Sequence, residues 1–205
     1  MACTDCHGTA GHPYARVSVP AVCARCHDAP GEITLRSYRN GPAARRGEAC
    51  PDCHLPEAGS HDFRGPARPG FLRGIATLGV SIRRDIGGDT ALLRIRHRAG
   101  HALPGGTTGR AVWLLVDQHD ASGGVVAERQ YRFGWLHSPT TGWRENSLPP
   151  GIGKVVEVPL HTAARQIRVK LIYRFRAGAL ELVDPEQVVL VEQARSVSSG
   201  LEWAQ

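Results

Sequence analysis

The chain has 205 residues, 41% of them hydrophobic, and a net charge of +6 from 25 Lys and Arg against 19 Asp and Glu. Its mean hydropathy is −0.25, no apolar run is long enough to cross a bilayer, and no signal-peptide core opens the sequence. The arginines alternate with apolar residues and form no basic cluster interleaved with aromatics. We therefore expect no membrane span and no nucleic-acid partner.

All six cysteines belong to three copies of one motif, C-x-x-C-H. The motif residues are Cys3, Cys6 and His7; Cys23, Cys26 and His27; and Cys50, Cys53 and His54. In this pattern two thiols three residues apart reach the two vinyl groups of a c-type haem, and the adjoining histidine binds the iron. The motifs predict three covalently attached haems with one proximal histidine each.

Two other uses of these cysteines explain less of the pattern. A zinc site needs four ligands, usually from two cysteine pairs, so three pairs make an unsuitable set. A disulfide framework is conceivable in an exported chain. Both leave the histidine after each second cysteine unexplained, so the pattern favours haem.

Residues 1–66 contain all three motifs but few large apolar side chains. A core of that size could not hold 66 residues together, so we expect the haems to form the core and the chain to wrap them with short helices and little regular structure. The sequence GPARPG at 65–70 is typical of a linker. We therefore predict a trihaem domain over residues 1–66 and a second domain over 67–205.

Beyond the linker, apolar and polar residues alternate with the period of β-strands. Seven strands are predicted, at residues 77–84, 91–98, 111–119, 125–133, 154–160, 166–175 and 187–194. The sequence DASGG at 120–124 predicts a hairpin, and LPPG at 148–151 predicts a turn. This pattern favours an all-β antiparallel sandwich of immunoglobulin-like build.

The charge divides at the same boundary. Residues 1–66 carry seven Arg and seven acidic residues, so residues 67–205 hold the whole +6. Haem propionates would make the first domain acidic and would attract a basic sandwich to it. For most of these arginines, however, we expect only that they cover the solvent face of a sheet.

The second axial ligand of each iron decides whether a haem carries electrons or reacts with a substrate. Met1 is the only methionine, two positions before Cys3, so bis-histidine ligation and rather low potentials are expected. Outside the motifs, residues 1–66 contain only His12 and His61. Three bis-histidine haems therefore need at least one ligand from the sandwich or from another chain.

Among the sandwich histidines, His101 is the best candidate, because it lies in the rigid sequence GHALPGG at 100–106, where a strand ends. His97 is predicted to point inward from its strand, as a hydrogen-bonded core residue. Three further histidines lie in or beside polar turns and are expected at the surface: His119, His137 and His161.

The sequences CPDCHLP at 50–56, SHDF at 60–63 and GHALPGGTTGRAVWL at 100–114 resemble multihaem c-type cytochromes with a C-terminal β-sandwich, in a match that spans nearly the whole chain. The resemblance implies that His61 and His101 are distal haem ligands. The chain departs from the family pattern at Leu103, where an aromatic is usual, and at Gly105, which follows the proline. Members often have more haem motifs upstream, so we expect a processed or trimmed piece of a larger protein.

We expect a trihaem electron-transfer cytochrome with His12, His61 and His101 as distal ligands and with redox proteins as its partners. Covalent haem attachment implies a periplasmic or extracellular location. One alternative is a multihaem reductase of a small nitrogen or sulfur oxide, or a peroxidase, with one open haem. Another is a subunit of an extracellular haem filament, in which a neighbouring copy supplies a histidine.

Overall fold

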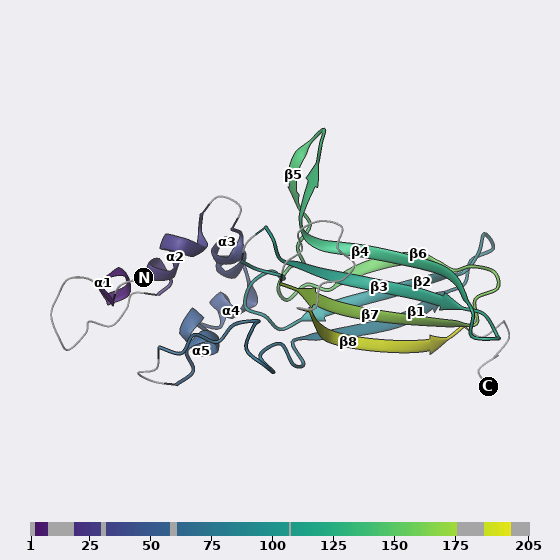
Figure 1. Cartoon of the computed structure of the whole chain (residues 1–205), viewed down its shortest axis with the longest axis horizontal. Helices are drawn as coiled ribbons and strands as arrows, with labels where there is room; N and C mark the ends of the chain where they lie inside the picture. The colour runs from purple at the N-terminus through teal and green to yellow at the C-terminus, as the bar shows by residue number, and fades with distance from the viewer. Residues whose placement is uncertain are drawn as a thin grey trace.

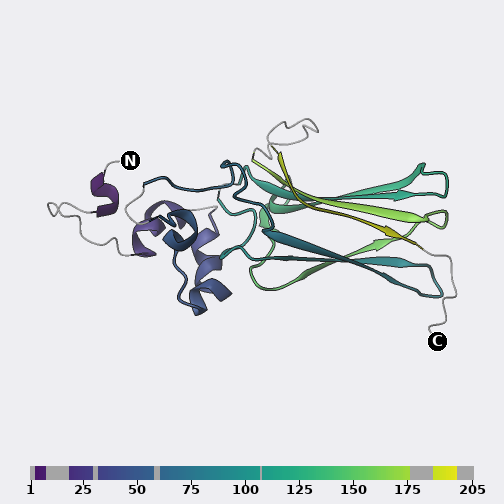
Figure 2. The ribbon, with the colours of Figure 1, turned by 90° about the horizontal axis from the view of Figure 1, so that it is seen from below.

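The computed structural model describes residues 3–7, 19–29, 32–57, 61–106, 108–175 and 187–197. Short helices lie beyond one end of a two-layered β-sandwich (Figure 1). Turned by a quarter, the molecule shows the two sheets edge-on as separate layers, again with the helices at one end (Figure 2). The motif-bearing segment therefore meets the strand ends of the sandwich and leaves its faces uncovered.

The described helices are short, as expected for a segment with little apolar sequence. Their bounds are α1 Cys3–His7, α2 Ala21–His27, α3 Thr34–Arg39, α4 Pro42–Arg45 and α5 Cys50–His54. Proline stands in the first turn of α4 and of α5, where its missing N–H is not needed. No helix in the described ranges is long and apolar enough to span a membrane.

The strands form two antiparallel sheets, which confirms a β-sandwich. Their bounds are β1 Ala76–Arg83, β2 Thr90–His97, β3 Ala111–His119, β4 Val125–Ser138, β5 Gly142–Glu145, β6 Lys154–Pro159, β7 Gln166–Arg174 and β8 Gln187–Ser196. One sheet has the order β1-β2-β6 and the other has the order β5-β4-β3-β7-β8. β1 also packs beside β8, which joins the two layers along one side.

The core lies between the sheets and comes from alternate residues of each strand. On β2, Leu93 and Ile95 are almost fully buried while Arg94 and Arg96 are exposed. β3 and β7, at the centre of the larger sheet, bury Leu114, Leu171 and similar residues completely. This period-two alternation is the pattern that predicted the strands.

All seven predicted strands occur, with bounds that differ by a few residues at most except for β4. β4 continues to Ser138, and its end pairs with β5, a strand that the sequence did not predict. The register joins Trp135 to Glu145 and His137 to Trp143. This hairpin rises out of the sandwich at the end nearest the helices (Figure 1).

The surface position expected for His119 is wrong, because its side chain is only 8% exposed. The pairing of β3 with β4 shifts register between Gln118 and His119. A β-bulge of this kind interrupts the alternation, so both residues are buried in succession. The Nδ1 atom of His119 bonds the carbonyl oxygen of Gly123 at 3.0 Å.

Candidate functional site

Each C-x-x-C-H motif lies on its own short helix: α1, α2 or α5. Residues three and four apart share one face of a helix, so a helical turn places the two thiols and the following imidazole side by side. This local geometry is what attachment of one planar group through both thiols requires. The helical conformation of the motifs therefore fits the function that their spacing predicts.

Thiols from different motifs lie close together. Burial raises the pKa of Cys23 to about 11, and the neighbouring thiols of Cys50, which hydrogen-bonds it, and Cys6 raise it further. The cysteines whose side chains are described are all free thiols: Cys6, Cys23, Cys26, Cys50 and Cys53. Groups attached to the three motifs would consequently be close neighbours.

The rings of His54 and His101 face each other, with centroids 6.3 Å apart and planes only 9° from parallel. Because a metal–imidazole bond is about 2 Å long, two imidazoles on opposite sides of one metal have ring centres about 6 Å apart. The separation thus fits a single metal ion between them. His54 comes from α5 and His101 from the loop that follows β2.

Backbone carbonyls orient both rings for this arrangement. The Nδ1 atom of His54 is 2.5 Å from the carbonyl oxygen of Arg64, and that of His101 is 2.9 Å from the carbonyl oxygen of Ala102. Since a carbonyl oxygen can only accept, each Nδ1 must carry the proton, which leaves each Nε2 with a lone pair for a metal. The two histidines have the tautomer that a metal ligand needs.

The loop that carries His101 is fixed by its own backbone and by the sandwich. Leu103 exchanges backbone hydrogen bonds with Leu148 at 3.0 and 2.8 Å, and the Tyr173 hydroxyl donates to the Pro104 carbonyl at 3.0 Å. Gly105 has a φ of +65°, and a Cβ there would lie 2.7 Å from Cε1 of His101. The departure from the family pattern at Gly105 therefore makes room for the His101 ring.

Burial lowers the pKa of His101 to about 4. The hydrogen bond to the Ala102 carbonyl has the opposite effect and raises this pKa, whereas the nearby His54, His97 and His27 lower it further. The ring is therefore neutral at physiological pH. Metal binding requires the neutral imidazole, so no proton has to be removed before this ligand can bind.

Helices α3 and α4 dock against the same loop. The backbone N–H groups of Ala102 and Gly106 donate to the hydroxyls of Ser37 and Thr34, both at 3.0 Å. Gly41 approaches so closely that a Cβ would lie 3.1 Å from the Gly100 carbonyl oxygen. Sequence reasoning missed these contacts, because hydroxyls on a helix carry no signal of a partner some seventy residues away.

A second histidine pair joins α1 to the segment after α5. The rings of His7 and His61 have centroids 5.9 Å apart and planes 64° apart. Rotation about a shared metal–nitrogen axis changes the angle between the planes but leaves the separation unchanged, so this separation also fits one metal ion.

His27, the histidine of the second motif, has a different contact in the structure. Its Nδ1 lies 4.0 Å from a carboxylate oxygen of Glu32, and its side chain is exposed. His12, the remaining predicted ligand, lies outside the described residues. Both histidines stay predicted haem ligands.

The remaining histidines divide between core and surface. The Nε2 atom of His97 bonds the Leu148 carbonyl oxygen at 3.1 Å, and burial lowers the pKa of its ring. This agrees with the predicted hydrogen-bonded inward position. His137 and His161 are exposed, as expected.

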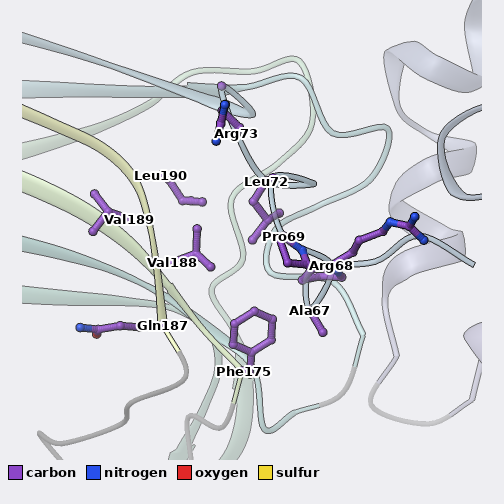
Figure 3. Close-up of a pocket in the computed structure, with 13 residues that line it drawn as sticks. Ala67, Arg68, Pro69, Leu72, Arg73, Phe175, Gln187, Val188, Val189 and Leu190 are labelled. Carbon is purple, nitrogen blue, oxygen red and sulfur yellow. The ribbon is translucent and has the colours of Figure 1, made fainter.

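A separate groove of about 560 Å³ lies between the linker and the strand ends of β7 and β8 (Figure 3). Phe175, Val188 and Leu190 line it on the sandwich side, and Leu72 and Pro69 face them from the linker. The groove contains none of the predicted site residues, so it is distinct from the paired histidines.

Comparison with known proteins finds a similar fold among solved structures. No protein-family model matches the chain, and no curated protein sequence is significantly similar to it. Among solved structures, the chain is similar to a penta-heme cytochrome c552 from Thermochromatium tepidum, with a TM-score of 0.67 and 20% sequence identity. The match covers 86% of this chain and 55% of that one, so this chain spans about half the length of its structural neighbour. The chain thus shares its fold with part of a multihaem cytochrome.

Proposed function

We propose that the protein is a multihaem c-type cytochrome that passes single electrons between partner proteins. The observation that carries the proposal is the facing pair His54 and His101, 6.3 Å apart, with both Nδ1 atoms bonded to backbone carbonyls. His54 completes a C-x-x-C-H motif, so the metal between the rings would be the iron of a haem attached to Cys50 and Cys53. The similarity in fold to a penta-heme cytochrome supports this assignment.

The same assignment extends to the other motifs, giving three haems. Cys3 and Cys6 would hold one haem, with His7 and His61 on its iron. Cys23 and Cys26 would hold a second, with His27 as the proximal ligand and His12, by elimination, as the distal one. Each iron would then have two histidines and no free position for a substrate. A haem so ligated takes up or releases one electron without binding a small molecule.

The residues of the chain fix the ligands and keep their lone pairs available. The carbonyls of Arg64 and Ala102 hold the Nδ1 protons, which orients each ring and raises its basicity. Burial keeps His101 neutral, and Gly105 leaves room for its ring. These contacts would hold both ligand rings in place on a bound haem, so the reorganisation that accompanies electron transfer would be small.

This function also accounts for the weak core of the helical segment. The haems would supply the apolar interior of residues 1–66, and the sandwich of residues 67–205 would supply one distal ligand. Thioether attachment takes place on the outer side of the bacterial cytoplasmic membrane, so we place the protein in the periplasm or outside the cell. Its partners would be redox proteins.

Intact mass and spectroscopy test the proposal. The mass should exceed that of the polypeptide by three haems, and the oxidised protein should give only low-spin electron paramagnetic resonance signals. The reduced spectrum should not change with carbon monoxide. A stoichiometric high-spin signal with carbon monoxide binding would instead favour a reductase or peroxidase with one open haem. An unshifted mass would end the haem proposal.

The His101→Ala variant tests the facing pair itself. One haem should become high-spin while the other two stay low-spin, because each distal histidine serves one iron. The matched control is His137→Ala, since His137 is exposed on the protruding hairpin. A His101→Ala spectrum identical to that of the parent would refute the pairing, and a spin state that varies with protein concentration would indicate a ligand from a neighbouring copy.

A further inference from the structure

The outer face of the β1-β2-β6 sheet carries a group of arginines at its end nearest the helices. Because side chains alternate along a strand, Arg94 and Arg96 of β2 both point to this face, about 7 Å apart. Arg98 follows in the same direction, and its guanidinium donates to the Arg73 carbonyl at 3.4 Å. All three side chains are exposed, and we call them the arginine face: Arg94, Arg96 and Arg98.

The arginines at the two ends of this sheet differ in their ion pairs. At the end far from the helices, Arg83 pairs with Asp85 at 2.8 Å and with Glu157 at 3.1 Å, and Arg84 pairs with Asp89. Within the described part of the chain, no ion pair to a carboxylate involves any member of the arginine face. The uncompensated charge is therefore concentrated at one end of a rigid, paired strand.

The end of the sheet that carries the arginine face is also the end beside the proposed haem ligands. β2 ends at His97, and the loop that begins there carries Arg98 and His101. Arg98 is thus three residues from His101 along this loop, and the His101 ring lies 6.3 Å from that of His54, between centroids. A partner bound on the arginine face would lie close to the group between His54 and His101.

The chemistry of the arginine face favours an acidic protein as its binding partner. A guanidinium presents a fixed fork of donors that matches a carboxylate, and a row of them on one strand matches a row of Asp or Glu side chains. The outward neighbours on β1 are small, Thr77, Gly79 and Ser81, so the face is open to a second surface. None of these neighbours is aromatic, and the stacking platform that single-stranded nucleic acid uses is absent from this face as described.

We propose that the arginine face is the docking surface for an acidic one-electron redox protein. The proposal rests on the proposed function, because the electron would pass between the partner's redox group and the haem held by His54 and His101. In this step a reduced partner loses one electron, the ferric iron gains it, and no bond forms or breaks. Arg94 and Arg96 would bind the partner's carboxylates and hold it near that haem.

The test uses the haem-loaded protein and a plant-type ferredoxin, an acidic one-electron donor with a potential of about −400 mV. The variant is Arg94→Gln/Arg96→Gln. The matched control, Arg129→Gln/Arg168→Gln, removes the same charge from exposed positions of the other sheet. Calorimetry measures binding of oxidised ferredoxin, and stopped-flow absorbance measures electron transfer from reduced ferredoxin.

At low ionic strength, the Arg94→Gln/Arg96→Gln variant should bind ferredoxin about ten-fold more weakly and accept electrons correspondingly more slowly, while the control changes less than about two-fold. Both effects should shrink at physiological salt, where the screening length falls to about 8 Å. Reduction by the methyl viologen radical cation should not slow in either variant, since this donor is itself positive.

The possible results separate the two proposals. Equal losses in the variant and the control would mean that only net charge matters and would overturn the docking surface. Failure of the parent protein to bind ferredoxin, with binding to anionic phospholipid vesicles that depends on Arg94 and Arg96, would replace the acidic protein by a membrane. Binding that depends on Arg94 and Arg96 without any electron transfer would support the surface and refute the proposed function.

Discussion

The sandwich and the helical segment obtain their stability in different ways. The sandwich buries apolar side chains from every strand except β5, and many of them are completely inaccessible. In the described part of residues 1–66, the buried apolar residues are only Ile33, Leu35 and Ala43, and all three lie in or beside α3 and α4. Those two helices are the ones that dock on the sandwich.

The sandwich therefore has an apolar core of its own, whereas the helical segment needs stabilisation from outside its own side chains. Burial stabilises roughly in proportion to the apolar area removed from water, so three buried residues offset little of the entropy of ordering the helices. The segment must draw on its contacts with the sandwich and, under our proposal, on haem. A change that weakens the helical segment should therefore leave the sandwich folded, and a local change in the sandwich core should leave haem attachment unaffected.

The largest effect is expected from Cys50→Ala/Cys53→Ala, which removes the thioether bonds of the third motif. The mass should fall by one haem, and residues 32–57 should become sensitive to protease because their largest apolar group is gone. The sandwich should still unfold cooperatively by circular dichroism. Unchanged protease resistance of the helical segment would show that haem is not its core.

A smaller effect, in the other part, is expected from Leu114→Ala. Leu114 is completely buried in β3, so the cavity should lower the free energy of unfolding of the sandwich by about 3 kcal/mol. Urea unfolding followed by circular dichroism measures this, and the haem count should not change. The control is Val125→Ala, at a residue 53% exposed, which should change stability by less than about 0.5 kcal/mol. Loss of haem from the Leu114→Ala protein would contradict the independence of the two parts.

The contact between the parts should respond to Thr34→Val/Ser37→Ala. Both hydroxyls accept backbone N–H groups of the His101 loop, and their loss should weaken docking by about 2 kcal/mol. Hydrogen exchange should accelerate at the amides of Ala102 and Gly106. The same substitutions in the hairpin turn, Thr140→Val/Ser138→Ala, are the control, and equal exchange in both variants would refute directed docking.

The smallest effect concerns Asp120, far from the helices. Its carboxylate accepts hydrogen bonds from Ser122 and Gly124, which hold its pKa below the ordinary value of 3.8. A depressed pKa in the folded state stabilises above the unfolded pKa, and this stabilisation is lost as the pH falls through the folded value. In the Asp120→Asn variant, the melting temperature should therefore fall less steeply between pH 5 and pH 2, about the titration range of a carboxyl, than it does in the parent protein. Parallel curves for the two proteins would contradict this.

Much of the sandwich could be predicted because alternation is a local signal. β2 and β3 show their buried and exposed faces in consecutive residues, so the sequence indicates both strand and orientation. β5 was missed because its four residues, Gly142–Glu145, are intermediate or exposed and show no alternation. His119 was misplaced because a bulge reverses the alternation at a single residue.

The candidate site could likewise be predicted only in part from the sequence. The motif spacing predicts which thiols and histidines belong together on each helix. It says nothing about which distant ring faces which, since the approach of His101 to His54 depends on a loop held by Leu148 and Tyr173. The docking of Ser37 and Thr34 is likewise a product of the folded chain and has no local signature.

The position of His101 after β2 has a consequence for the order in which the protein matures. Under the proposed function and location, Cys50 and Cys53 would leave the translocation channel before the strands that hold the loop, so a haem could be attached to them while only His54 is available as a ligand. The loop is fixed by Leu148 and Tyr173, which come much later in the chain. Completion of the second ligation would then coincide with closure of the sandwich, and the colour change of that one haem would report that the chain as far as Tyr173 has been exported and folded.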